Sequence, residues 1–548
     1  MPKVLISDKL SLKAEKIFIE RGIEVDVITG LEKDELIKII DKYDGLAIRS
    51  STKVTQKVLD AASNLKVVGR AGIGVDNVDI PYATSKGVAV MNTPFGNAIT
   101  TAEHTISLIM SLVRNIPQAN ESTHQGKWEK SKYMGTEITG KTLGVIGCGN
   151  IGSIVADRAL GLKMKVLAFD PFLTEEKALD LKVKKVDLEE LLSFSDIITL
   201  HVPMTDQTAN IINKDTLEKC KDGVRIVNCA RGGLVDEKAL KRFIEKGKVA
   251  GAAIDVYEIE PAKESIFFDM EEVICTPHLG ASTLEAQENV ALQVADQMSD
   301  FLTTGAVSNA INMPSISASE APILKPFTKV AEQLGLFVGQ LMPSDYHEIS
   351  IDYVGDVSNY NCAPITSAAV AGILNASFPD INMVSAPSIA KDKGIAITET
   401  KKDEYSAYES YIRITLLSKN DSFSIGGTTF SDGKPRIVQI NKINLEAELM
   451  TNMLYVTNND VPGLIGSLGN ILGDEGINIA SFNLGRTAPL KEAMALIGID
   501  NPVNDNVISE VKKLESVVHV KSLNFNICLL YTSPSPRDLS TSRMPSSA

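Results

Sequence analysis

The sequence lacks several features that would place the protein in a specialised class. It has six cysteines in 548 residues, and none belongs to a C-x-x-C pair. This argues against a zinc ribbon, a redox motif or a disulfide framework, and no metal site is expected. No run of about 18 apolar residues occurs, so no membrane span is expected.

The sequence also has no excess of positive charge. Its 55 Lys and Arg residues face 69 Asp and Glu residues, which gives a formal net charge of −14. Nucleic acids and anionic lipids bind basic surfaces, so neither is an expected partner. An anionic small molecule would need a local cluster of basic residues. The N-terminus does not read as a signal peptide, which favours a cytoplasmic protein.

The order of apolar and helical patterns predicts several domains. A single hydrophobic core stops growing at roughly 250–300 residues, so the chain must contain at least two. Residues 1–95 alternate short strands with helices, and a second βα series runs from Lys141 to about residue 283. Both series predict parallel βα units. A helix is expected at 284–302, and a Ser-, Ala- and Pro-rich connector near residue 311.

The C-terminal part predicts a smaller unit. Residues 453–526 show the order βαββαβ, typical of an α+β domain. Pro462 is expected at the first position of a helix and Gly476 at its C-terminal cap. Residues from 527 on are rich in Ser and Pro and lack hydrophobic periodicity. We expect this tail to be disordered and foreign to the protein.

The segment LGVIGCGNIG predicts a dinucleotide site. Gly147, Gly149 and Gly152 have the G-x-G-x-x-G spacing between an apolar strand and a helix, and Asp170 ends the next strand. The glycines allow a tight turn, approach of a pyrophosphate, and close packing of helix and strand. Asp170 can bind a ribose and would repel a 2′-phosphate, so NAD is favoured over NADP. FAD, or a glycine turn without ligand, are the alternatives.

Three residues at the ends of strands are the candidate catalytic groups. His278 is the candidate base for the proton of a secondary alcohol; His201 is its rival, while His104, inside an amphipathic helix, is expected to be packed. Arg231 can hold a carboxylate with two hydrogen bonds, and Glu260 can orient the His278 ring. Alternatively, Arg231 forms a surface ion pair and Glu260 is a solvated loop residue.

Three motifs together resemble the D-isomer-specific 2-hydroxyacid dehydrogenase family: NCARGGLVDE, Asp-x-Tyr-x-x-Glu-Pro, and PHLGAST. Three more segments, VGRAGIGVDNVD, NTPFGNAITTAEH and GKWEKSKYMGTEITGKTLGVIG, narrow the resemblance over about residues 1–526. They are similar to the branch that oxidises 3-phosphoglycerate in the phosphorylated serine pathway. In that family a histidine is the acid/base, a glutamate supports it and an arginine binds substrate, which implies these roles for His278, Glu260 and Arg231.

The resemblance implies an α/β fold in several parts. A Rossmann-type NAD domain (96–284) would be inserted in a flavodoxin-like substrate-binding domain (1–95 and 285–312). An α+β intervening domain (313–450), a βαββαβ ACT domain (451–526) and the tail (527–548) would follow. The segment NNDVPGLIGSLGNILGDEGINIASFNLGR carries the ACT resemblance, with Asp460, Pro462, Gly463, Gly476 and Asn478 at matching positions.

The resemblance also implies contact positions for the ligands. The implied cofactor contacts are Ile73, Gly147, Gly149, Asn150, Ile151, Gly152, Asp170, Val202, Cys229, Ala230, Arg231, Asp255, His278, Leu279, Gly280 and Ala281. The implied substrate contacts are Arg49, Arg70, Gly74, Asn97 and Lys130. Lys130 and Lys132 stand where an arginine is common.

The ACT resemblance implies control by L-serine. The effector would bind between Asp460 of one subunit and Asn478 of its partner, in a homodimer or homotetramer. Alternatively, Asp460 caps a helix and Asn478 satisfies a turn, without any ligand. Two other functions stay open: another D-2-hydroxyacid dehydrogenase, such as a glycerate or hydroxypyruvate reductase, and a catalytically silent NAD-sensing regulator. Retention of Arg231, Glu260 and His278 weighs against the regulator.

Overall fold

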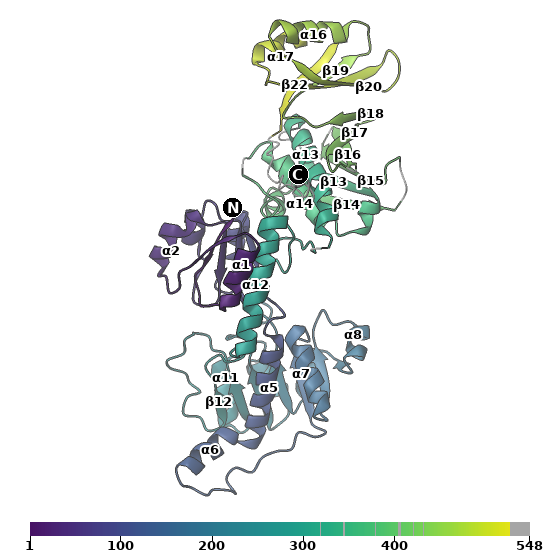
Figure 1. Cartoon of the computed structure of the whole chain (residues 1–548). Coiled ribbons are helices and arrows are strands. Elements are labelled where there is room, and N and C mark those ends of the chain that lie inside the picture. Colours follow the sequence, from purple (N-terminus) through teal and green to yellow (C-terminus); the bar gives the residue numbers. More distant parts are fainter. Residues whose placement is uncertain are drawn as a thin grey trace, which may run out of the picture. The chain divides into compact units, whose positions relative to one another are not determined.

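The computed structural model describes residues 1–317, 319–342, 346–378, 380–403, 407–419, 421–430 and 432–525 (Figure 1). The tail expected to be disordered lies outside these ranges. The chain divides into unit 1 (Met1–Asp79 and Val90–Thr303) and unit 2 (Ile80–Ala89 and Thr304–Ala548). In the described ranges, no helix is long and apolar enough to cross a membrane.

The N-terminal lobe is built on a five-stranded sheet of order β2-β1-β3-β4-β5. Its strands are β1 (Lys3–Ile6), β2 (Glu24–Val27), β3 (Gly45–Ile48), β4 (Val67–Arg70) and β5 (Ala89–Met91). The helices between them are α1 (Leu12–Glu20), α2 (Lys33–Ile39), η1 (Ile40–Lys42), α3 (Gln56–Ala61) and α4 (Ile80–Ser85). This is the flavodoxin-like strand order, as predicted, although no pattern in the sequence indicates the two short helices α3 and α4.

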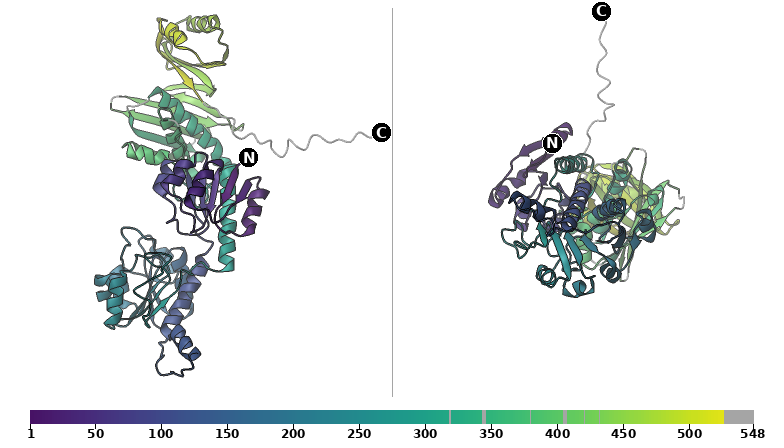
Figure 2. Two further views of the ribbon diagram at one scale, coloured as in Figure 1. Left: turned by 90° about the vertical axis from the view of Figure 1, so that its left-hand side faces the viewer. Right: turned by 90° about the horizontal axis from the view of Figure 1, so that it is seen from below.

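Helix α12 (Leu284–Thr304) returns the chain to this lobe, starting from residues that line the cleft described below. It lies beside α1 in Figure 1 and along the N-terminal lobe in the left view of Figure 2. Arg21 Nη1 lies 2.9 Å from Asp300 Oδ1, and Gln297 Nε2 donates to the backbone oxygen of Asn92 at 2.8 Å. Val294 and Met298 are fully buried. Residues almost 300 positions apart therefore share one hydrophobic core.

The second lobe of unit 1 contains a seven-stranded sheet of order β12-β11-β10-β9-β6-β7-β8. Its strands are β6 (Thr142–Ile146), β7 (Lys165–Phe169), β8 (Lys184–Lys185), β9 (Ile197–Leu200), β10 (Val224–Asn228), β11 (Val249–Ile254) and β12 (Val273–Cys275). Every neighbouring pair is parallel. Counted from β6, this is the Rossmann order 3-2-1-4-5-6 with one strand added, which confirms the predicted fold.

Helices cover both faces of this sheet. The helices are α5 (Ala98–Arg114), α6 (Ile116–His124), α7 (Asn150–Gly161), α8 (Glu175–Asp180), α9 (Leu188–Phe194), α10 (Lys214–Lys219) and α11 (Glu237–Glu245). Side chains of α5 and α7 form one core with the strands, and those of α9, α10 and α11 form the other. The buried stripe of α5 passes through Leu108, Ile109, Leu112 and Val113, whereas Met110 is 37% exposed.

Unit 2 begins with a mixed α/β part. Its sheet has the order β14-β13-β15-β16-β17-β18, in which only β13 and β14 pair in parallel. The strands are β13 (Tyr346–Gly355), β14 (Ala396–Lys402), β15 (Ser410–Ser418), β16 (Ser422–Thr429), β17 (Pro435–Ile440) and β18 (Ile443–Glu448). The helices are α13 (Ala321–Leu341), η2 (Asp356–Asn359), α14 (Ala363–Asn375) and α15 (Ala386–Asp392).

The C-terminal part of unit 2 is an antiparallel sheet of order β20-β21-β19-β22 with two helices on one face. The strands are β19 (Asn452–Asn459), β20 (Ile479–Arg486), β21 (Glu492–Ile499) and β22 (Val517–Asn524); the helices are α16 (Leu464–Asp474) and α17 (Asp505–Lys512). The predicted βαββαβ order is confirmed. Pro462 is not the first helical residue, because Gly463 (φ 103°) precedes α16 as its N-cap.

Candidate active site

The glycine-rich turn after β6 leaves open space for a ligand. A Cβ on Gly152 would lie 1.9 Å from the backbone oxygen of Gly147, so α7 can approach the turn only with glycine there. Gly147 has φ 90°, which favours glycine. A Cβ on Gly149 would meet nothing within 4 Å. A pyrophosphate can therefore approach this backbone and the N-terminal amides of α7.

Asp170, at the end of β7, is held beside this turn by two backbone amides. Its Oδ2 accepts a hydrogen bond from the amide of Cys148 at 2.8 Å, and its Oδ1 accepts one from the amide of Phe172 at 2.8 Å. A carboxylate can accept about four hydrogen bonds, so Asp170 can still accept hydrogen bonds from the hydroxyl groups of a ribose. The turn and the carboxylate together fit the adenosine diphosphate half of NAD.

His278 and Glu260 form a close pair. Nδ1 of His278 lies 2.6 Å from Oε2 of Glu260, and Oε1 of Glu260 accepts a hydrogen bond from the amide of Tyr257 at 3.0 Å. The carboxylate is therefore fixed at both oxygens and orients the imidazole ring. With Nδ1 held in this way, Nε2 is the nitrogen that can exchange a proton with a substrate.

The turn that carries His278 is tied to a fully buried carboxylate. Asp255 accepts hydrogen bonds from the hydroxyl of Thr276 (2.6 Å) and the amides of Leu279 (2.7 Å) and Gly280 (2.9 Å). His278 itself has φ 55°, a left-handed conformation unusual for histidine. One of these hydrogen bonds comes from Thr276, before His278, and two come from Leu279 and Gly280, after it. Together they hold the backbone of His278 in this conformation.

Asp255 stays charged despite its burial. Burial alone would raise its pKa, but hydrogen bonding and the proximity of His104 lower the pKa below its usual value. Nε2 of His104 lies 3.2 Å from Oδ1 of Asp255. His104 therefore pairs with a structural carboxylate and is not a candidate for the catalytic base. Cys229 lies in the same cluster, but burial raises the pKa of its thiol to about 12.

His201 is not available as the catalytic base. The residue is only partly exposed, its Nδ1 is buried without a hydrogen-bond partner among the described residues, and burial lowers its pKa to about 3. Its Nε2 lies 3.0 Å from the hydroxyl of Thr199. A neutral imidazole enclosed by protein cannot exchange protons with a substrate in the cleft, which leaves His278 as the candidate.

A cleft of about 620 Å³ joins His278 and Glu260 to residues of the N-terminal lobe. Its lining includes Arg49, Arg70, Asn97 and Ala281 from the predicted contacts. Burial, together with the nearby guanidinium groups of Arg231 and Arg49, lowers the pKa of Arg70 to about 10. Arg70 is therefore still a cation at neutral pH.

Arg70 lacks a partner for part of its guanidinium. Its Nε is buried without a hydrogen-bond partner among the described residues. A Cβ on Gly72 would lie 1.8 Å from Nη1 of Arg70, so the missing side chain makes room for the guanidinium. A partly buried cation with a buried, unused donor favours an anionic ligand, because a buried polar group without a partner is costly.

Arg231 reaches from the loop after β10 to the loop after β4. Its Nε lies 3.0 Å from Oδ2 of Asp76, and its Nη1 donates to the backbone oxygen of Ala230 at 2.6 Å. A Cβ on Gly74 would lie 1.7 Å from Nη2 of Arg231. The guanidinium therefore lies directly against Gly74. Sequence reasoning missed Asp76, although it belongs to the quoted segment VGRAGIGVDNVD.

Other predicted contacts lie around the two parts of the site. Val202 Cγ1 lies 2.6 Å from a Cβ built on Gly147, and Asn150 Nδ2 lies 3.4 Å from the backbone oxygen of Pro94. The backbone oxygen of Ile73 accepts a hydrogen bond from Asn92. Lys130 is exposed in the segment after α6 and does not line the cleft of its own chain.

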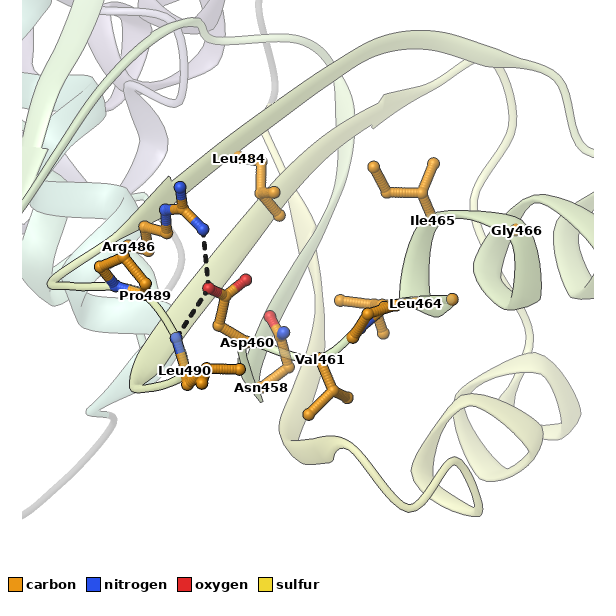
Figure 3. A pocket seen from close by; sticks show the side chains of 12 residues that line it. Asn458, Asp460, Val461, Leu464, Ile465, Gly466, Leu484, Arg486, Pro489 and Leu490 are labelled. Atoms are coloured by element: carbon orange, nitrogen blue, oxygen red, sulfur yellow. Dashed lines mark hydrogen bonds and ion pairs between the residues drawn. The ribbon is translucent and has the colours of Figure 1, made fainter.

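A second pocket, of about 390 Å³, opens at the start of α16 (Figure 3). Oδ2 of Asp460 accepts hydrogen bonds from Nη1 of Arg486 at 2.8 Å and from the amide of Leu490 at 3.1 Å. The bond from Arg486 lowers the pKa of Asp460. Asp460 does not cap α16, so the capping part of the alternative is wrong. Asn478 does not line this pocket and donates to Oδ2 of Asp500 at 2.8 Å.

Three family profiles match this chain. They describe the NAD binding domain of the D-isomer specific 2-hydroxyacid dehydrogenases (residues 106–280), the D-3-phosphoglycerate dehydrogenase intervening domain (323–441) and the ACT domain (452–516). Among curated relatives, D-3-phosphoglycerate dehydrogenase of Synechocystis sp. is 41% identical over 94% of each chain. The D-3-phosphoglycerate dehydrogenase of Bacillus subtilis is 40% identical over 96% of this chain and 100% of its own.

Solved structures share the fold of the first part of the chain. A glyoxylate reductase from Paecilomyes thermophila is 28% identical, with a TM-score of 0.53 over 57% of this chain and 98% of its own. A D-lactate dehydrogenase from Aquifex aeolicus, solved with NAD and lactic acid, is 27% identical, with a TM-score of 0.51 over 57% of this chain and 100% of its own.

Proposed function

Because the chain belongs to the D-3-phosphoglycerate dehydrogenase family, we propose that it oxidises the C2 hydroxyl of 3-phospho-D-glycerate to the ketone of 3-phosphohydroxypyruvate. The reaction is the first step of L-serine biosynthesis by the phosphorylated route. The observation that carries the proposal is the pairing of His278 with Glu260 in a cleft that also holds Arg49 and Arg70.

His278 acts as the acid/base. Its Nε2 takes the proton of the C2 hydroxyl during oxidation and returns it during reduction. Glu260, 2.6 Å from Nδ1, stabilises the imidazolium that forms. Arg231 holds the C1 carboxylate with its remaining N–H groups and so aligns C2 for the reaction.

NAD is the cofactor, and it accepts the hydride from C2 when it is bound. Gly147, Gly149 and Gly152 would receive its pyrophosphate, and Asp170 would bind the adenosine ribose. His278, on the PHLGAST turn, and Arg231 hold the substrate at the carboxyl ends of the strands, where ligands of this fold bind.

The arginines of the N-terminal lobe favour a phosphorylated substrate. Arg49 and Arg70 line the cleft, and Nε of Arg70 is a buried donor without a partner among the described residues. A phosphate dianion satisfies such donors better than the neutral hydroxyl of glycerate or hydroxypyruvate. This supports 3-phosphoglycerate over the unphosphorylated acids. Lys130 would complete the phosphate site only from a second copy of the chain.

The ACT domain supports feedback control by an amino acid, and we take L-serine as the effector. Asp460 would bind the amino group and Asn478 of a partner subunit the carboxylate or hydroxyl. Because Asp460 is held by Arg486, the amino group must share or replace this ion pair. The arrangement requires a homodimer or homotetramer to bring the two residues together.

The proposal is tested by measuring NADH oxidation with 3-phosphohydroxypyruvate, hydroxypyruvate and glyoxylate side by side. The expected result is a kcat/KM for the phosphorylated acid at least 10-fold above those for the other two. Higher efficiency with hydroxypyruvate or glyoxylate would identify a reductase of unphosphorylated acids. No oxidation of NADH with any of the three would indicate a silent regulator.

A further inference from the structure

Asp76 is the only acidic residue of the described chain whose carboxylate forms an ion pair with Arg231. It stands in the loop after β4, whereas Arg231 follows β10, so the two residues are 155 positions apart in the sequence. Asp76 is largely exposed, yet its Oδ2 lies 3.0 Å from Nε of Arg231. Neither residue lines the cleft, but both are close enough to Arg70, which does, to act on its pKa. The pair contains the arginine that the proposed function assigns to the substrate carboxylate.

The bonds that Arg231 already makes fix its orientation. A guanidinium has five N–H groups. The Nε–H group points at Asp76, and one N–H of Nη1 points at the oxygen of Ala230. The two N–H groups of Nη2 and one of Nη1 remain for a ligand. One N–H of Nη2 lies on the same side of the guanidinium as Nε. The other faces outward beside Nη1, on an edge that can bind a carboxylate with two hydrogen bonds.

Charge also connects Asp76 with the neighbouring arginines. The guanidinium groups of Arg231 and Arg49 lower the pKa of Arg70, and Asp76 acts in the opposite direction. Asp8 acts on Arg70 in the same direction as Asp76, but Asp76 is the carboxylate that is paired with Arg231. Without it, Arg231 would be free to turn toward solvent and away from Arg70.

We propose that Asp76 is a positioning residue for catalysis. By holding Nε of Arg231, it presents the outer edge of the guanidinium to the substrate carboxylate. It does not touch the reacting atoms itself. The proposal rests on the proposed role of Arg231 in binding the carboxylate of a 2-hydroxy or 2-oxo acid, and it applies to any substrate of that class.

The test is a double-mutant cycle in the full-length protein, with variants Asp76→Ala, Arg231→Gln and both together. Asp76→Ala should raise KM for the 2-oxo acid about 10-fold and leave KM for NADH within 2-fold. In the Arg231→Gln background, the same change should alter kcat/KM less than 2-fold, because the residue that Asp76 positions is gone. Asp76→Asn should recover part of the loss, since an amide oxygen still accepts from Nε.

The control is Asp222→Ala. Asp222 is more exposed than Asp76 and pairs with Lys248 at 2.8 Å, outside the cleft lining. Its removal should change no kinetic constant by more than 2-fold. Thermal unfolding of all variants shows whether they fold like the parent protein.

The assays use 3-phosphohydroxypyruvate, hydroxypyruvate and glyoxylate, which all carry a carboxylate beside the carbonyl. A parent protein active only on hydroxypyruvate and glyoxylate would contradict the proposed substrate. The effect of Asp76→Ala could still be measured with these two acids. Two results would overturn the positioning role. One is an unchanged or lower KM in Asp76→Ala, as expected if Asp76 merely competes with the substrate. The other is an undiminished effect of Asp76→Ala in the Arg231→Gln background.

Discussion

Nδ1 of His278 lies 2.6 Å from Oε2 of Glu260, although the two residues are 18 positions apart and follow different strands. The amide of Tyr257 holds the other oxygen of Glu260. In a parallel sheet, the loops after neighbouring strands meet at one edge, and this edge positions the two side chains. A base and its supporting carboxylate are therefore in place before any substrate arrives.

His278→Asn should remove most of the turnover and leave the binding of NAD nearly unchanged. The amide cannot take a proton, and positioned acid/base groups contribute about 10²–10⁴-fold to rate. Steady-state kinetics and equilibrium dialysis with NAD measure the two effects. His124→Asn, an exposed histidine at the end of α6, is the control. Turnover within a few-fold of the parent would exclude His278 as the base.

Arg70→Gln should weaken binding of the phosphorylated substrate selectively. Hydrogen bonds to charged groups contribute about 1.5–3 kcal/mol, so KM for 3-phosphohydroxypyruvate should rise about 10- to 100-fold. KM for glyoxylate, which has no phosphate, should change less than 3-fold. Arg158→Gln on the surface of α7 is the control. Equal increases for both acids would place Arg70 at the carboxylate instead.

Asp170→Ala should reduce the preference for NAD over NADP. The carboxylate beside the glycine-rich turn would repel a 2′-phosphate, and alanine removes that repulsion. The measurement is the ratio of kcat/KM with NAD to kcat/KM with NADP, which should fall at least 10-fold. A parent protein that already prefers NADP contradicts the assignment.

His201 should lower the free energy of unfolding of the protein as the pH falls. Its pKa is lowered to about 3 by burial, whereas an unfolded chain titrates near the ordinary value of 6.5. Between these values the unfolded state binds the extra proton, so stability rises with pH and is lost as pH falls below about 6.5. His201→Asn should therefore lose less thermal stability than the parent between pH 7 and pH 5. An equal loss in both proteins would contradict the buried, neutral state.

L-Serine at millimolar concentration should inhibit the enzyme, and Asp460→Ala or Asn478→Ala should abolish the inhibition without lowering uninhibited activity. The two residues lie apart in one chain, so the effect requires an assembled oligomer. Asp474→Ala, at the exposed end of α16, is the control. Equilibrium dialysis that detects no serine bound to the intact protein would remove the regulatory proposal.

The long elements and the nucleotide motif could be predicted from the sequence because their signals are local. One βαβ unit contains Gly147, Gly149, Gly152 and Asp170. Their spacing alone therefore predicts that they lie close together in the fold. The sequence pattern does not indicate the short helices α3 and α4, and the sequence of α6 has the composition of a polar segment. A helix of six to nine residues has too few turns to show a clear apolar stripe.

Contacts between distant loops could not be predicted, because no local pattern encodes them. Asp76 meets Arg231 only through the packing of the two lobes, and Arg486 meets Asp460 only through the pairing order of β20 and β19 with β21. The choice between His201 and His278 likewise depended on burial. Both end a strand in the sequence, but only His278 faces the cleft.

Transfer of hydrogen from C2 tests the central proposal most directly. The parent protein is incubated with NAD and 3-phosphoglycerate carrying deuterium at C2, and the reduced cofactor is analysed by mass spectrometry. We expect one deuterium in each NADH formed, together with 3-phosphohydroxypyruvate as the product. NADH without deuterium, or no reduced cofactor at all, would contradict oxidation of 3-phosphoglycerate at C2.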